Sequence, residues 1–257
     1  MRITGAADVL RRAGLKVSET KGWKGRDNGR DFDFIRGLTV HHTAGSVNSS
    51  VSGELKVLID GRPGLAGPIS QFMVARDGTW HCVADGAANH NKTGKAGPNK
   101  GYGNSQLIGV ECQHHGSPEK WTDVQYNSVV RGVAALAKAY GFTETTVAGH
   151  KEHQPGEKVD PSFNMNDFRK AVDKAMKASD PPPRKVDWME FPVAMPVLKE
   201  GDRDDKLDGY DIIKRLQRLL QIKDDGIWGP QTTKAVGGKV MTEALYRKHF
   251  GLSVPKK

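Results

Sequence analysis

One stretch of the chain places a histidine and an aspartate on a segment rich in turn-forming residues. Residues 149–161 read GHKEHQPGEKVDP, with His150 near the start and Asp160 near the end. Pro155 and Gly156 bend the backbone between them, so the two side chains can converge on one point. Imidazole and carboxylate are both good zinc ligands. Because two ligands make a weak site, a third must come from elsewhere in the chain.

The strand-like run at residues 38–43 supplies that third ligand. Side chains of a strand alternate between its two faces. Leu38 and Val40 are apolar and should face the helices together with His42, which leaves His41 on the face open to a cleft. We therefore expect His41 to bind the metal and His42 to pack or form a hydrogen bond. Taken alone, the pair is better explained as two ordinary strand histidines.

A second strand-like run, residues 107–113, directs one carboxylate to a cleft. Ile108, Val110 and Cys112 share one face, which must be the core face. Glu111 lies on the other face. A carboxylate beside a metal can take a proton from bound water. Without the other segments, Glu111 is equally explained as a glutamate on an exposed sheet face.

Together, His41, His150 and Asp160 form a set of two histidines and one aspartate. Three protein ligands with a fourth position left for water are typical of a catalytic zinc. Zinc can lower the pKa of that water to about 7. Lys158, two positions before Asp160, can stabilise an oxyanion, or it is simply an exposed loop lysine. His153 is the rival ligand, ranked lower because it precedes the Pro-Gly bend and has no matching partner.

These segments together resemble the type-2 zinc-dependent N-acetylmuramoyl-L-alanine amidases, which share a fold with the peptidoglycan recognition proteins and with phage lysozyme-like amidases. The matching features are His-x-Thr-Ala after a strand, an Ile-Gly-Val-Glu strand, and Gly-His-(x)7-Lys-x-Asp-Pro, all within residues 36–165. The resemblance implies Zn²⁺ as the cofactor. It assigns the metal ligands to His41, His150 and Asp160, and the catalytic groups to Glu111 and Lys158. We also expect His90 and Asn91 to line the substrate groove.

Helical and strand-like patterns alternate along the first two thirds of the chain. We expect helices at residues 6–13, 49–60, 122–140 and 166–178, and strands at 38–43, 71–76, 79–84 and 107–113. Asp77-Gly78 suits the tight turn of a hairpin. Residues 15–35 and 86–105 are expected as loops, the second a long surface loop. The pattern predicts an α/β fold with a mixed central sheet flanked by helices.

A proline-rich stretch divides the chain. Three consecutive prolines at 181–183 favour an extended spacer. We expect a catalytic domain at residues 1–178, a linker at 179–195 and a small all-α domain at 196–257. Its helices are expected at 210–221, 232–236 and 240–250. Residues 198–202, 213–220 and 225–232 resemble a helical peptidoglycan-binding module, with Trp228 expected in its core.

The net charge, the N-terminal residues and the number of cysteines narrow the class of protein. The chain has 39 basic and 30 acidic residues, a net charge of +9, and no block of like charges. This charge favours approach to a polyanion such as a cell wall or DNA. The alternative is that it serves only to keep the protein in solution. The N-terminus lacks the apolar stretch of a secretion signal, which predicts a cytoplasmic product. Two cysteines, Cys82 and Cys112, are too few for a disulfide framework and are expected to be buried thiols, with one disulfide between them as the alternative.

The resulting hypothesis is an enzyme, a cell-wall hydrolase that cleaves the amide between N-acetylmuramic acid and L-alanine. Its expected setting is a phage endolysin, held in the cytoplasm of the infected host until it is released to the wall. We expect a monomer that binds bacterial peptidoglycan, with no nucleic-acid partner and no stable membrane association. The alternatives are a non-catalytic peptidoglycan receptor, a zinc peptidase acting on the stem peptide, and, from charge alone, a nucleic-acid binder.

Overall fold

A computed structural model describes residues 1–178, 198–199 and 240–241. The chain divides into two compact units, Met1–Pro181 and Pro182–Lys257. In the second unit, the described residues are two short strands, β9 (Leu198–Lys199) and β10 (Val240–Met241), which pair in antiparallel fashion. The expected helix at 240–250 is therefore wrong at Val240 and Met241. The other helices expected beyond residue 196, and Trp228, lie outside the described residues.

The first unit is built on a six-stranded mixed sheet. Its order is β1 (Val17–Glu19), β6 (Trp80–Cys82), β5 (Phe72–Val74), β7 (Leu107–Cys112), β2 (Gly37–His42) and β8 (Val147–Gly149). Neighbouring strands run parallel except β5 and β6, which form the predicted hairpin. All residues of β2 and β7 are buried, as expected of central parallel strands covered on both faces. A separate short hairpin joins β3 (Gly61–Arg62) to β4 (Leu65–Ala66).

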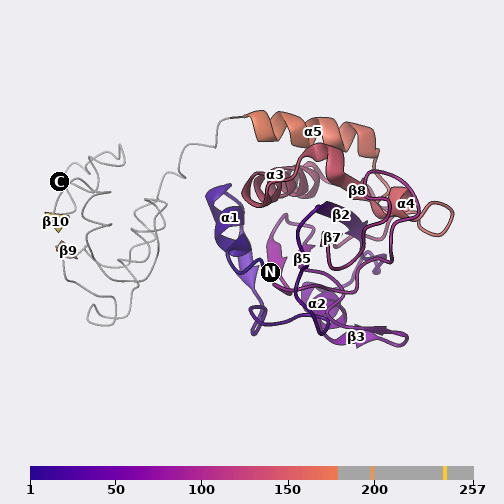
Figure 1. The fold of residues 1–257 in the computed structure, drawn as a ribbon, viewed down its shortest axis with the longest axis horizontal. Coiled ribbons are helices and arrows are strands. Elements are labelled where there is room, and N and C mark those ends of the chain that lie inside the picture. The colour runs from indigo at the N-terminus through magenta and orange to yellow at the C-terminus, as the bar shows by residue number, and fades with distance from the viewer. Residues whose placement is uncertain (179–197, 200–239, 242–257) are drawn as a thin grey trace. The chain divides into compact units, whose positions relative to one another are not determined.

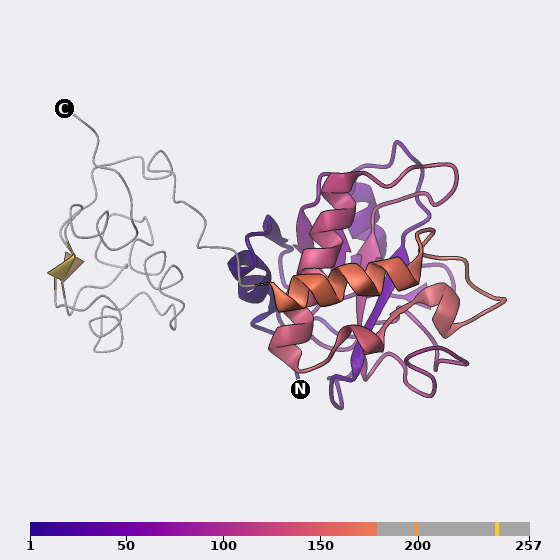
Figure 2. The ribbon, with the colours of Figure 1, turned by 90° about the horizontal axis from the view of Figure 1, so that it is seen from above.

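Helices cover both faces of this sheet (Figure 1). On one side lie α1 (Ala6–Arg12), α3 (Asp123–Tyr140) and α5 (Met165–Lys177), and α5 crosses α3 in the turned view (Figure 2). On the other side lies α2 (Val51–Asp60). Two short elements flank β8, the 3-10 turn η1 (Glu144–Thr146) and α4 (His150–His153). This layering confirms the predicted α/β fold with a mixed central sheet.

Two clusters of buried side chains hold the layers together. The larger joins the helices α1, α3 and α5 to one face of the sheet, and its members from β2 and β7 are Leu38, Val40, Ile108, Val110 and Cys112. The smaller lies between α2 and the other face, at Leu58, Ile69, Met73 and Val83. The face assignment made from strand alternation is therefore correct, because Leu38, Val40 and Cys112 all face the larger core.

Capping side chains stabilise the starts of three helices. The side chain of Thr122 accepts a hydrogen bond from the Gln125 amide at the start of α3, and Gly141 follows its last residue. Ser50 and Asn164 cap α2 and α5 in the same way. All four helices expected in the first unit are confirmed, with boundaries shifted by one or two residues.

Three expectations are corrected by the structure. Residues 15–35 are not all loop, because Val17–Glu19 form the edge strand β1. The strand β8 and the helix α4 were not expected. Residues 86–105 contain no helix or named strand, but their first part is buried, so the description as a surface loop is wrong.

Both cysteines are buried free thiols, as expected. Within the described part of the chain, no helix has the length and apolar character needed to cross a membrane.

Candidate metal centre

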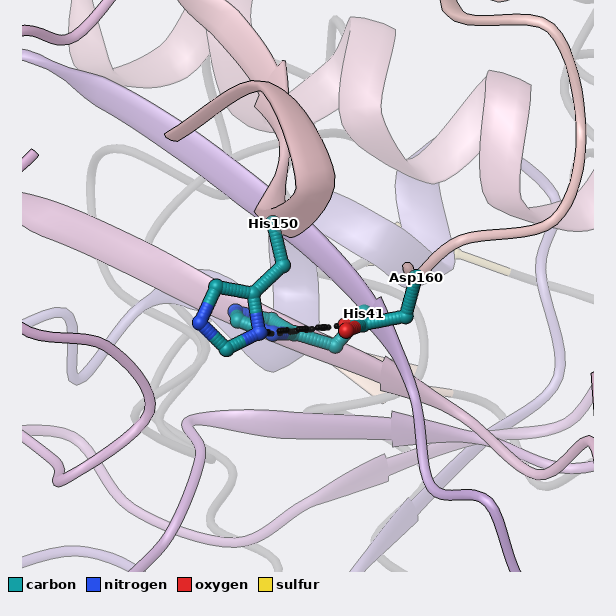
Figure 3. Close-up of side chains that lie close together, drawn as sticks. All are labelled: His41, His150 and Asp160. Carbon is teal, nitrogen blue, oxygen red and sulfur yellow. Dashed lines mark hydrogen bonds and ion pairs between the residues drawn. The ribbon is translucent and has the colours of Figure 1, made fainter. Parts of the chain in front are cut away.

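Three side chains from distant parts of the chain converge at one edge of the sheet. His41 Nδ1 lies 2.9 Å from His150 Nδ1 and 3.3 Å from Asp160 Oδ2, and His150 Nδ1 lies 3.2 Å from the same carboxylate oxygen. Figure 3 shows the two rings and the carboxylate directed at one another. Among the described residues, this is the only group of three or more His, Cys, Asp or Glu close enough to share a metal ion.

The local fold explains how these side chains meet. His41 lies at the end of β2, and β8 pairs with β2 on the opposite side from β7, so His150, directly after β8, is beside it. The backbone then turns through Gly156, whose φ of +80° is a left-handed conformation that glycine adopts without strain. The Lys151 amide donates to the Asp160 carbonyl at 2.7 Å, which closes the loop. The expected bend between His150 and Asp160 is confirmed.

The spacing of the three donor atoms fits a tetrahedral zinc site. Zinc binds nitrogen and oxygen at about 2.0–2.2 Å, and tetrahedral ligands at that distance lie roughly 3.3–3.6 Å apart. The observed separations of 2.9–3.3 Å need only a small expansion. Both outer ring nitrogens are already engaged: His41 Nε2 contacts His90 Nδ1 at 3.1 Å, and His150 Nε2 contacts Gln154 Oε1 at 2.9 Å. Each Nδ1 therefore faces the shared point.

The surroundings of His41 and Asp160 favour, at neutral pH, the protonation states in which these side chains can bind a metal. Burial lowers the pKa of His41 to about 4, which keeps its imidazole neutral with a free lone pair. Burial acts to raise the pKa of Asp160, but its hydrogen bonds with His150 and His41 outweigh that effect and hold the pKa well below its usual range. A neutral imidazole and an ionised carboxylate are the forms that bind a metal.

Glu111 lies beside this group on the neighbouring strand. The register pairs Glu111 of β7 with His41 of β2, so their side chains share a face. Glu111 is only 8% exposed, and its Oε2 has no hydrogen-bond partner among the described residues. Burial, followed by the charges of Asp160 and Glu54, raises the pKa of Glu111 well above its usual value. A carboxylate with a raised pKa is a competent proton acceptor.

The remaining predicted residues lie in different surroundings. Lys158 is exposed, and its positive charge acts to lower the pKa of Glu111. His153 is fully buried and points elsewhere, with Nε2 2.9 Å from the Lys92 carbonyl. His42 lies on the opposite face of β2, in register with Cys112 and near His114. Neither His42 nor His153 belongs to the convergent group.

Two residues next to the convergent group of His41, His150 and Asp160 were missed or misplaced by sequence reasoning. His90 was expected in the groove, yet it is 5% exposed and contacts His41 from behind. Gln154, 1% exposed, was not singled out, although it directly follows α4 and lies four residues after His150, a spacing that brings two side chains together at a helical turn.

Comparison with known proteins gives the family. The model of a family described as N-acetylmuramoyl-L-alanine amidase matches residues 30–163, just over half of the 257-residue chain. A search of curated protein sequences gave no match.

Several solved structures are similar at low identity. The amidase LysC from Clostridium intestinale URNW is 18% identical, with 61% of this chain and 97% of that chain covered and a TM-score of 0.47. The Ph2119 endolysin from Thermus scotoductus MAT2119 bacteriophage Ph2119 is 17% identical, with 61% and 99% covered and a TM-score of 0.43. The Staphylococcus aureus hydrolase AmiA is 16% identical, with 63% and 82% covered and a TM-score of 0.46. The family match, rather than these distant similarities, supports the assignment: the chain belongs to the N-acetylmuramoyl-L-alanine amidase family and is a peptidoglycan amidase.

Proposed function

We propose that this amidase depends on zinc, with His41, His150 and Asp160 as the metal ligands. The observation that carries the proposal is the convergence of their three donor atoms, 2.9–3.3 Å apart, on the face that also holds Glu111. The bond cleaved is the amide between the lactyl group of N-acetylmuramic acid and L-alanine.

The proposed chemistry divides between the metal and two side chains. A bound zinc ion supplies Lewis-acid activation of water and of the amide carbonyl. Glu111 accepts the proton of the attacking water at its unpartnered Oε2 and then delivers it to the departing nitrogen of L-alanine. Lys158 places a positive charge near this site and offsets the negative charge that develops on the amide oxygen.

The test is mass spectrometry of muropeptides after digestion of purified peptidoglycan. The amidase releases intact stem peptides with a free L-alanine amino terminus and leaves unsubstituted glycan. A zinc peptidase would instead cut within the stem peptide, and a non-catalytic receptor would leave the material unchanged. Either of those results contradicts the proposal.

The proposed biological role is host-cell lysis by a phage endolysin. The enzyme would collect in the cytoplasm of the infected host and act on the wall once the membrane is opened. Two features support this role: the resemblance of residues 198–202 and 225–232 to a peptidoglycan-binding module, and a net charge of +9 that attracts the chain to anionic wall polymers. Expression in a bacterial host should cause lysis only when a membrane-permeabilising agent is added. Lysis without that agent, or none with it, would contradict the role.

A further inference from the structure

His90 contacts the ring of His41 on the side opposite to the nitrogen that faces His150 and Asp160. It lies in the loop at residues 86–105, between β6 and β7, and is 5% exposed. Its Nδ1 is 3.1 Å from His41 Nε2, and its Nε2 is 2.9 Å from the Leu107 carbonyl oxygen. The ring therefore connects β2 to the beginning of β7, the strand that also carries Glu111.

The hydrogen positions in this chain of contacts follow from what each atom can do. The Leu107 carbonyl can only accept, so His90 Nε2 carries the proton. Neutral His90 then offers a lone pair at Nδ1, where the Asn91 amide also donates at 2.8 Å. In the tautomer that binds a metal through Nδ1, His41 carries its proton on Nε2 and donates it to the same lone pair of His90, so the lone pair of His41 lies at Nδ1, on the side of His150 and Asp160.

We propose that His90 is a positioning residue that fixes the tautomer and the ring orientation of His41 for metal binding, an inference that rests on the proposed zinc dependence. Partners that hold the outer nitrogen of a ligand histidine restrict its rotation and raise its basicity. His90 acts only through His41.

The residues packed around His90 hold its ring in place against His41. A Cβ added to Gly109 of β7 would lie 2.6 Å from His90 Cγ and 2.8 Å from Cδ2, so the glycine at this point lets the ring pack closely against the strand. The loop itself is held by Asn104, whose Oδ1 accepts from the amides of His90 at 3.2 Å and Asn91 at 2.9 Å. The Asn91 side chain also contacts Thr39 Oγ1 at 3.2 Å. The His90 ring therefore has little freedom to leave His41.

Zinc affinity, measured on the full chain by competition with a fluorescent chelator, tests the inference. His90→Leu keeps a buried side chain but removes the acceptor, and should weaken zinc binding about 10- to 100-fold. His90→Asn can place an amide oxygen near the former Nδ1 position and should recover much of the affinity. His153→Leu is the matched control, because it also removes a buried histidine bonded to a backbone carbonyl and should leave affinity unchanged.

The outcomes separate this inference from the proposed function. If the wild-type chain binds no zinc, the proposed zinc dependence fails. If it binds zinc but His90→Leu binds equally well, or His153→Leu weakens binding as much, only the role of His90 is overturned. Should His90→Leu fail to fold, long-range ¹H–¹⁵N correlation spectra of the wild-type chain decide. They should show His90 protonated at Nε2 and not at Nδ1, and a His90 proton on Nδ1 would overturn the inference.

Discussion

His41 and His42 are adjacent near the end of β2, but their side chains point to opposite faces of the sheet, because side chains alternate along a strand. His41 meets His150 and Asp160 on one face, while His42 lies on the face that carries Cys112 and the helical core. Glu111, in register with His41, joins the same face from β7. The chemistry of the site therefore depends on which face each of a few side chains occupies.

The first prediction at this scale concerns Glu111→Gln. The amide keeps the size of the side chain but cannot accept the proton, so turnover should fall about 100- to 10,000-fold while zinc content stays the same. Glu19→Gln is the control, since Glu19 lies on β1, at the opposite edge of the sheet from β8 and outside the metal group. It should retain most of the activity. Undiminished turnover in Glu111→Gln, measured on soluble muropeptides, would remove Glu111 as the base.

The second prediction uses the two neighbouring histidines as their own control. His41→Ala should lose both zinc and activity, because a two-ligand site binds zinc poorly. His42→Ala should retain zinc, since His42 faces away from Asp160 and His150. Metal content by atomic emission of the purified variants checks this. The reverse pattern would move the ligand to His42 and contradict the strand assignment.

Sequence reasoning reached these residues because alternation along a strand is a local property. Leu38 and Val40 identify the core face of their strand, and His41 follows from them. It did not place His90 behind His41, or single out Gln154. The position of His90 depends on the path of the loop at residues 86–105, which hydrophobic periodicity does not encode.

At the scale of elements, α4 holds His150 and is itself held by α5. Glu152 of α4 accepts two hydrogen bonds from Arg169 of α5, both at 2.8 Å, and a third from the Gly149 amide at 3.0 Å. Arg169 also donates to the Val147 carbonyl at 3.1 Å. One pair of charged residues thus connects α5 to β8 and to the helix that carries His150.

Replacing Arg169 by Met should therefore lower stability, and the loss should depend on pH. Burial acts to raise the pKa of Glu152, but the bonds from Arg169 outweigh it, so the pKa lies below its usual value. The Arg169–Glu152 pair contributes its full stabilisation at pH values above the pKa of Glu152 in the unfolded chain, about 4.3. This stabilisation is lost as the pH falls through the lower pKa of Glu152 in the folded chain. We expect a loss of about 1–3 kcal/mol in the free energy of unfolding at pH 7, and a smaller difference near pH 3.

Urea denaturation at the two pH values measures this effect. Lys170→Met is the control, because Lys170 contacts Asp167 at 3.6 Å in an exposed pair that contributes less than about 1 kcal/mol. A loss in Arg169→Met that is the same at both pH values would assign the effect to packing alone.

Elements with strong periodicity were predictable, whereas the short elements β1 and α4 were not. The 18 residues of α3 carry a continuous apolar stripe between Thr122 and Gly141, enough to identify the helix from sequence. The three residues of β1 include two exposed positions, so their strand conformation comes from pairing with β6 rather than from a local pattern. The four residues of α4 are too few for a helical period to be visible.

At the scale of the whole molecule, the chain divides into the units Met1–Pro181 and Pro182–Lys257, and the family match lies entirely within the first. We expect the fragment of residues 1–181 to cleave soluble muropeptides at a rate close to that of the full chain. On insoluble sacculi it should be at least roughly tenfold slower at low enzyme concentration, because tethering raises the local concentration of substrate. Equal rates on sacculi would contradict a wall-binding role for the second unit.

Anomalous diffraction at the zinc edge, from crystals grown with zinc, tests the central claim most directly. The account predicts one strong peak within about 2.0–2.2 Å of His41 Nδ1, His150 Nδ1 and Asp160 Oδ2. A peak at other residues, such as His42 or His153, or no peak in crystals of protein that still digests peptidoglycan with a chelator present, would contradict it.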